Sequence, residues 1–255
     1  MLEKSRMYLL ILEVILKVLI KPPTVHKKPQ PYQVLFTRTG TMDTESSMWF
    51  LSEGDLYQHT KPYRLMFVPT DPAAPRSNLV GREVANIRIR DIRLATEEEL
   101  TFDRAGLMVL SGACESISYE DRGDVTKLHD EYFAPLHETL KAIFHAWKPL
   151  NGPIKDWPLA LCDASTVNVD TDLEKADAVQ PDTIEENYQV YYRPQQRWYY
   201  VSEQKNSEVL LFRVFDSVLG QNAAGVPHAA FQHPGADGTE RPRESIEANL
   251  VLWWD

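Results

Sequence analysis

Residues 187–215, NYQVYYRPQQRWYYVSEQKNSEVLLFRVF, contain three short runs of strand-favouring residues. The runs at 187–192, 197–201 and 209–215 are rich in Tyr, Trp, Val and Phe, which suit the pleated surface of a sheet. A final run at 246–252 begins with apolar residues that alternate with polar ones, as on a half-buried strand. Several short strands divided by turns are typical of a β-sandwich or a β-barrel.

The part of the chain before residue 187 adds further expected elements. Residues 84–94 alternate apolar and polar side chains and predict another strand. Residues 124–147 carry apolar side chains every four positions from Leu128 to Phe144, which predicts the longest amphipathic helix. Shorter strands are expected at 32–37 and within 100–110, and a loop is expected at 69–78.

Composition restricts the class of protein. The chain has 255 residues, 43% apolar and 25% charged, which is sufficient for an ordinary globular core. Its net charge of -10 argues against a nucleic-acid partner, because phosphate contacts need a clustered basic face. The two cysteines, Cys114 and Cys162, have no metal-binding spacing. These features favour a reducing compartment, and we expect the protein in the cytoplasm.

The apolar stretch 7–20 is only 14 residues long and contains Glu13 and Lys17. A membrane-spanning helix needs about 20 apolar residues, so we expect a short amphipathic helix here. A membrane-surface anchor and a cleaved signal peptide remain the alternatives. We expect residues 1–31 to form this helix and a Pro- and Lys-rich linker, and residues 32–255 to form the main domain.

Residues 227–249, PHAAFQHPGADGTERPRESIEAN, carry the most informative polar pattern. Arg243 and Ser245 are two residues apart at the start of the last expected strand, so their side chains point to one face. A guanidinium grips a carboxylate through two hydrogen bonds, and a hydroxyl adds another donor. His228, 15 residues before Arg243, offers an imidazole, which is a suitable ligand for iron. A surface histidine and a salt-bridged arginine would be the alternative explanation.

Four segments in order resemble the fungal and bacterial hydroxylase/desaturase family, whose members are iron- and 2-oxoglutarate-type oxygenases. The segments are 147–163, 188–194 with 197–200, 208–217, and 228–231 with 243–247, so that the motif-bearing part is 147–252. The resemblance implies an α+β fold with a double-stranded β-helix (jelly-roll) core and flanking helices. It also implies hydroxylation or desaturation of a small metabolite in secondary metabolism, with Fe(II) and 2-oxoglutarate as cofactors. His228 would match the distal metal histidine, and Arg243 the arginine that binds the cosubstrate.

The family's first metal motif, His-x-Asp, does not occur anywhere in the chain. His129 and Glu131 form a His-x-Glu, but on a helix residues two apart point in different directions and cannot grip one metal ion. His137 and Glu138 would need a histidine at the position of Lys141 to form a zinc-protease helix. We expect His145 to pack or cap at the end of the helix and His233 to have a loop role.

Two explanations of the missing motif remain open. One is a splice or gene-model variant of a working oxygenase, and the other is a member that has lost its metal centre and acts as a binding protein. A plain cupin-like structural domain would explain the strands but not the motifs. Asn249 is a further departure, because the family pattern carries arginine there.

The remaining polar and aromatic residues have mainly structural interpretations. The tyrosines and Trp198 in 188–200 favour strand packing over a substrate pocket. Asp163 and Asp216 are expected to cap turns, and Cys162 is expected to be a buried apolar filler.

Overall fold

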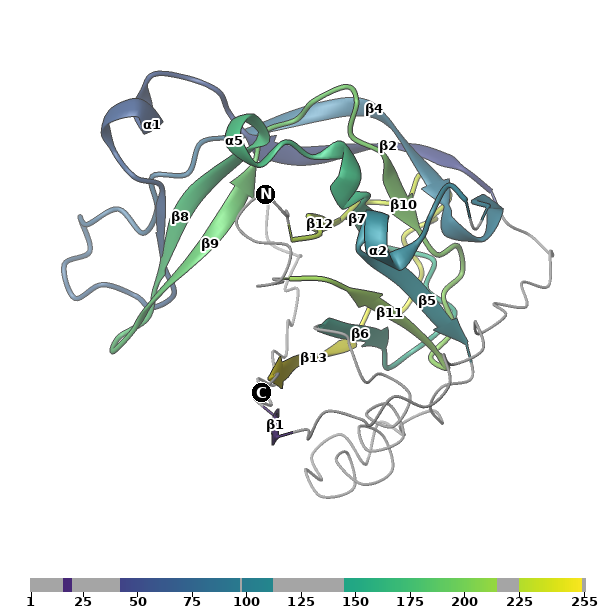
Figure 1. Cartoon of the computed structure of the whole chain (residues 1–255). Helices are drawn as coiled ribbons and strands as arrows, with labels where there is room; N and C mark the ends of the chain where they lie inside the picture. Colours follow the sequence, from purple (N-terminus) through teal and green to yellow (C-terminus); the bar gives the residue numbers. More distant parts are fainter. Residues whose placement is uncertain (1–15, 20–41, 97, 112–144, 215–224, 254–255) are drawn as a thin grey trace.

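The computed structural model describes residues 16–19, 42–96, 98–111, 145–214 and 225–253 (Figure 1). Within these ranges the protein is mostly β. The strands are β1 (Leu16–Leu19), β2 (Thr44–Leu51), β3 (Tyr63–Leu65), β4 (Gly81–Asp91), β5 (Leu107–Ser111), β6 (His145–Pro149), β7 (Leu159–Cys162), β8 (Leu173–Val179), β9 (Ile184–Val190), β10 (Trp198–Tyr200), β11 (Glu208–Phe212), β12 (His228–Ala230) and β13 (Ser245–Trp253). The helices are short: α1 (Leu56–His59), α2 (Phe102–Ala105), α5 (Val169–Asp172), and the 3-10 turns η1 (Ile92–Leu94) and η4 (Ala164–Thr166).

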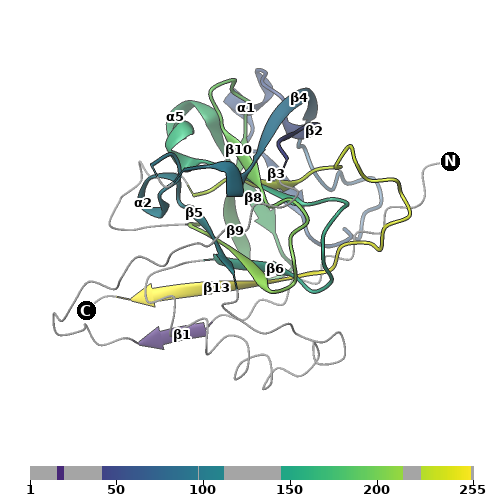
Figure 2. The ribbon, with the colours of Figure 1, turned by 90° about the vertical axis from the view of Figure 1, so that its right-hand side faces the viewer.

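The strands form two five-stranded sheets and one three-stranded sheet in a barrel-like arrangement. The first sheet has the order β1-β13-β6-β11-β5 and the second the order β12-β7-β10-β4-β2. The third, β3-β8-β9, projects to one side in Figure 1. At the outer edge of the first sheet, β1 lies alongside β13 in parallel (Figure 2). Strands distant in sequence therefore become neighbours, as β6 lies between β13 and β11.

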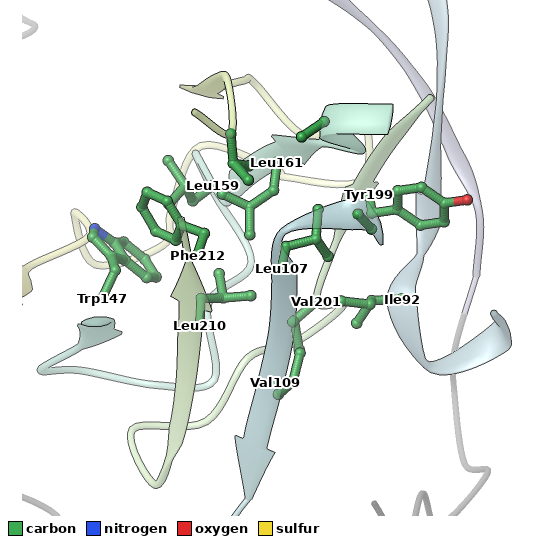
Figure 3. Close-up of a cluster of buried hydrophobic side chains, with 13 residues drawn as sticks. Ile92, Leu107, Val109, Trp147, Leu159, Leu161, Tyr199, Val201, Leu210 and Phe212 are labelled. Carbon is green, nitrogen blue, oxygen red and sulfur yellow. The ribbon is translucent and has the colours of Figure 1, made fainter. Parts of the chain in front are cut away.

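The main core lies between the two five-stranded sheets. Strands β5, β6 and β11 contribute from one side and β7 and β10 from the other. Figure 3 shows Trp147 and Phe212 at one end of this cluster and Ile92 and Tyr199 at the other. Because successive strand residues point to opposite faces, Ala160 and Cys162 on β7 face a second core cluster instead.

A buried polar network joins the two sheets beside this core. The Arg93 guanidinium in η1 donates to both carboxylate oxygens of Glu208 on β11, at 2.7 and 2.8 Å. It also donates to the Ser202 carbonyl, which follows β10. Asp91 accepts from the Arg93 backbone N–H and so caps η1. The network satisfies polar groups that would otherwise be costly to bury.

Most expected strands are confirmed. Strand β4 fills the first part of 84–94, after which the chain turns through η1, and β5 lies within 100–110 followed by Ser111. The three runs that opened the sequence analysis form β9, β10 and β11, and the last run forms β13. Residues 69–78 contain no helix or strand of the described set, as expected for a loop.

Two helix predictions are wrong where the structure describes them. The helix predicted over 124–147 does not include His145 to Trp147, because these residues pair with β11 and β13 as part of β6. The rest of that prediction, the strand at 32–37 and Asp216 lie outside the described residues. In 7–20, Leu16–Leu19 is a strand and not part of a helix, because it pairs with β13.

The α+β class with flanking helices is also too helical for the described residues, whose helices have three or four residues each. No described helix is long and apolar enough to cross a membrane. The packing interpretation of the aromatic run is confirmed for Trp198, Tyr199 and Tyr200, all of which are buried. Cys162 is fully buried, as expected.

Candidate functional site

Strand register brings His228 to the space between the two five-stranded sheets. His228 begins β12 and pairs with Leu161 on β7, so both side chains lie on one face of the second sheet. Leu161 belongs to the inter-sheet core. The His228 ring lies 4.8 Å from the ring of Phe212, measured between centroids, which places it against the opposite sheet.

His145 reaches the same space from the first sheet. It pairs with Phe212, and the two rings stack with centroids 4.6 Å apart and planes 13° apart. Its centroid lies 6.2 Å from that of His228. Two imidazoles that are 83 residues apart in the sequence therefore become neighbours at the Phe212 end of the core.

Glu247 supplies a carboxylate to this pair. Glu247 lies on β13 and pairs with Trp147 of β6. Trp147 is two residues after His145, so the side chains of all three residues lie on the same face of the sheet. One Glu247 carboxylate oxygen contacts His145 Nε2. Even so, neither nitrogen of His145 has a hydrogen-bond partner within the part of the chain that the structure describes.

Burial determines the protonation of His145 and shifts that of Glu247. His145 is 8% exposed, and desolvation, reinforced by neighbouring His228, lowers its pKa to about 3. Burial raises the pKa of Glu247 to about 7, against the opposing effect of the nearby Arg243 charge. At neutral pH the imidazole is therefore neutral, and its contact with Glu247 is not an ion pair despite the short approach.

The hydrogen bond of His228 selects its tautomer. Nδ1 lies 3.0 Å from the Val226 carbonyl oxygen, which can only accept, so Nδ1 carries the proton and donates it. In the neutral ring Nε2 then presents a free lone pair, the arrangement that metal-binding histidines use. His228 as a whole residue is exposed at the start of β12, yet protein atoms surround its imidazole closely, and this desolvation lowers the pKa of His228.

Arg243 and Ser245 lie at the start of β13, on the approach to Glu247. The Arg243 guanidinium carbon lies 5.1 Å from the centroid of the Trp147 ring, and Nη1 donates to the Trp157 carbonyl at 2.7 Å. Desolvation lowers the pKa of Arg243. A guanidinium has five N–H groups, so one bond to a carbonyl leaves others to meet an anion. Ser245 pairs with Pro149 and shares the face of Glu247.

Comparison with known proteins gives a consistent picture. A family model described as an oxidoreductase/YMDC permease-like domain matches residues 136–252. A hydroxylase/desaturase of Hormonema carpetanum is 33% identical over 131 residues, which cover 47% of this chain and 43% of that protein. The aspirochlorine biosynthesis protein N of Aspergillus oryzae is 32% identical over 114 residues, which cover 44% of this chain and 48% of that protein.

This chain is similar to fungal hydroxylases/desaturases. It spans about half the length of the curated relatives named above. A solved structure of the iron and alpha-ketoglutarate-dependent endoperoxidase NvfI shares the fold, with a TM-score of 0.67 at 21% identity. The match covers 82% of this chain and 97% of that chain.

The side chains beside His228 are of the types that non-haem iron oxygenases use, namely imidazole and carboxylate. Both His145 nitrogens are buried and have no hydrogen-bond partner among the described residues. The side chains of His145, His228 and Glu247 are not arranged around a common point. Among the described residues, no group of three His, Cys, Asp or Glu side chains is placed to hold a metal ion.

The structure brings some candidate residues together and leaves others apart. His145 packs as expected, because its buried ring stacks on Phe212, but it lies on strand β6 and not on a helix. His233 lies in a loop as expected, where Nδ1 accepts from the Gly235 N–H. Asp163 caps η4 as expected and also pairs with Arg197. His129, Glu131, His137 and Glu138 lie outside the described residues.

Sequence reasoning did not predict that His145 and Glu247 lie beside His228. The helical spacing that ends at Phe144 concealed the strand that starts at His145. A signal for Glu247 was present, because Arg243, Ser245 and Glu247 are spaced i, i+2 and i+4, which is one face of a strand.

Proposed function

We propose that this chain is a non-haem iron and 2-oxoglutarate-dependent oxidoreductase that hydroxylates or desaturates a small metabolite in secondary metabolism. The observation that carries the proposal is that His228, whose Nδ1 is bonded to the Val226 carbonyl, and the Arg243–Ser245 pair border the same Trp147–Phe212 end of the inter-sheet core. The relatives named hydroxylase/desaturase support the reaction class.

We also propose that the two five-stranded sheets form a double-stranded β-helix (jelly roll). In this proposal the domain covers residues 32–255, and its motif-bearing part is 147–252. The inter-sheet location of His228 is consistent with this description, since such folds place ligands between their sheets.

The protein's own residues then have separate tasks. His228 would hold the iron through Nε2, fixed in orientation by the Val226 carbonyl. The Arg243 guanidinium would bind a carboxylate of 2-oxoglutarate, and the Ser245 hydroxyl would donate to the same group. Trp147 packs beneath the guanidinium and keeps water from one side of it. Bound iron would supply the activation of dioxygen.

Release of succinate from 2-oxoglutarate tests this function without knowledge of the substrate. The expected result is iron-dependent succinate release by the unmodified protein and its loss in His228→Ala. His59→Ala, which changes an exposed histidine on α1, should retain the activity. Equal release from the unmodified protein and His228→Ala would sink the assignment.

A non-catalytic role as a metabolite-binding protein is the second candidate. It is favoured by one observation, namely that the described residues hold no ready three-ligand metal group. This role predicts that 2-oxoglutarate or a related dicarboxylate binds equally well with and without iron. Tight iron binding by three protein ligands would exclude it.

A further inference from the structure

We propose that Asn151 is a positioning residue for Arg243, the arginine that the proposed function assigns to a carboxylate of 2-oxoglutarate. The inference rests on the proposed function for the identity of that anion, but its argument uses only the contacts of the loop at 150–158. This loop leaves β6 after Pro149 and enters β7 at Leu159. It contacts the chain around Arg243 at both of its ends.

The first argument is the way in which Asn151 extends the pairing of β6 with β13. The strand ladder ends where Ser245 pairs with Pro149. Beyond this pair the Leu150 N–H donates to the Glu244 carbonyl at 2.8 Å. The next hydrogen bonds between the two segments come from the side chain of Asn151 and not from its backbone.

The Asn151 amide binds the backbone on both sides of Arg243. Its Nδ2 donates to the Pro242 carbonyl at 2.8 Å, and its Oδ1 accepts from the Glu244 N–H at 2.9 Å. A primary amide carries both a donor and an acceptor, so a single side chain can make both bonds. Asn151 thereby fixes the backbone before and after the arginine.

The second argument is that the far end of the same loop holds the guanidinium. Arg243 Nη1 donates to the Trp157 carbonyl at 2.7 Å, and the guanidinium carbon lies 5.1 Å from the centroid of the Trp147 ring. Trp157 has a φ of 47°, in the left-handed region that a large side chain rarely adopts. Such conformations persist where the surroundings enforce them, and they cluster at functional sites. The loop therefore holds Arg243 at its backbone and at its charged end.

The third argument is that the loop itself has firm support. Gly152 lies against the turns between β10 and β11, where an added Cβ would be 2.8 Å from Asn206 N and 3.0 Å from Gln204 O. The Ile154 N–H donates to the Gln204 carbonyl at 2.9 Å. A binding group that is already held in place loses less conformational freedom when its ligand arrives. Asn151 is therefore suited to hold Arg243 ready for an anion.

Anaerobic calorimetric titration with 2-oxoglutarate in the presence of Fe(II) tests the proposal in the full chain. Asn151→Ala should weaken binding about tenfold, because it removes two ordinary hydrogen bonds that hold the arginine in place. Asn187→Ala, at an exposed asparagine on β9, should bind as the unmodified protein does.

A double-mutant cycle separates positioning from general stability. If Asn151 acts through Arg243, Asn151→Ala should cost less than about twofold in affinity when Arg243→Gln is already present, because coupled residues are not additive. Equal losses with and without Arg243→Gln would mean a merely structural role and would overturn the inference.

A second readout needs no bound anion. Phenylglyoxal labels arginine side chains, and peptide mass spectrometry follows the label at Arg243. Asn151→Ala should speed this labelling by about fivefold or more, the equivalent of one lost hydrogen bond. Labelling of Arg88, an exposed arginine on β4, should stay the same. An unchanged rate at Arg243 would contradict the positioning role.

A third measurement uses the unmodified protein, so that misfolding of a variant cannot obscure the answer. Hydrogen exchange followed by NMR should show that the Glu244 N–H exchanges more than about tenfold slower than in the unfolded chain, because it is bonded to Asn151 Oδ1. Exchange at the rate of the unfolded chain would mean that this bond does not hold the backbone, and would overturn the inference.

The two proposals can fail separately. If the unmodified protein binds no 2-oxoglutarate, but Asn151→Ala speeds the labelling of Arg243, the positioning role stands without the proposed function. If succinate release and the labelling of Arg243 are both unchanged in Asn151→Ala, the proposed function stands without the positioning role.

Discussion

Arg243 combines a positive charge, the support of the Trp147 ring and an electrostatic interaction with Glu247. We expect Arg243→Gln to weaken the binding of 2-oxoglutarate to the iron-loaded protein about tenfold to a hundredfold, since a charge-assisted hydrogen bond contributes about 1.5–3 kcal/mol. Arg243→Lys should recover only part of this loss, because lysine keeps the charge but lacks the two-pronged guanidinium.

Anaerobic calorimetry with 2-oxoglutarate measures this effect. Arg241→Gln is the matched control, because Arg241 lies in the same segment and pairs with Glu244. Equal weakening by the two glutamine variants would mean that general positive charge, and not the position of Arg243, attracts the anion.

Cys162 gives a prediction about reactivity. Its thiol is fully buried, and desolvation raises its pKa to about 12. Because the thiolate is the reactive form, iodoacetamide at pH 8 should leave Cys162 unmodified in the native protein and modify it after unfolding in urea. Peptide mass spectrometry locates the label, and rapid native labelling at this residue would contradict the burial.

The spacing of Arg243 and Ser245 and the family resemblance together predict His228, Arg243 and Ser245 as site residues, and their roles stay predictions. The location of His145 beside His228 could not be predicted in this way. It depends on the pairing of β6 with β11 and β13, and these strands are 63 and 100 residues away in the sequence. Local periodicity contains no information on such long-range pairing, so the continuous helical pattern up to Phe144 gave the wrong result at His145.

Among the elements, β11 has the greatest structural importance near the site. It lies between β6 and β5, and Phe212 is fully buried against His145 and His228. Phe212→Ala should lower the free energy of unfolding by about 3–5 kcal/mol, as expected for a large buried aromatic residue. Urea denaturation measures it, with Val214→Ala, at an exposed position, as the control. A loss below about 1 kcal/mol would mean that β11 is not at the centre of the core.

The strands that sequence patterns found are those with dense β-branched and aromatic residues, such as β10 and β11. Strands β2, β3 and β8 were missed. Strand β8, LEKADAV, contains Glu, Lys and Asp, which are depleted in strands. It forms because β3 and β9 pair with it on both sides, which is a tertiary effect that overrides local preference.

At the scale of the whole molecule, the Arg93–Glu208 pair holds the two sheets together. Both side chains are about nine-tenths buried. Arg93→Met alone should destabilise the protein by about 3–5 kcal/mol, because it leaves the Glu208 carboxylate buried without its partner. The double variant Arg93→Met with Glu208→Leu should regain much of this loss. Thermal unfolding measures the stability of both variants, with Arg88→Met, which removes an exposed ion pair, as the control. If the losses from the two single substitutions simply add in the double variant, Arg93 and Glu208 are not coupled.

We predict one location for the proposed chemistry, the Phe212 end of the space between the two five-stranded sheets. Anomalous X-ray diffraction from crystals grown with Co(II) and 2-oxoglutarate tests this location most directly. We predict one strong anomalous peak within bonding distance of His228 Nε2, with 2-oxoglutarate beside it and its carboxylate on Arg243. An anomalous peak only at another place, or diffraction data from these crystals with no peak at His228, would contradict the proposed location.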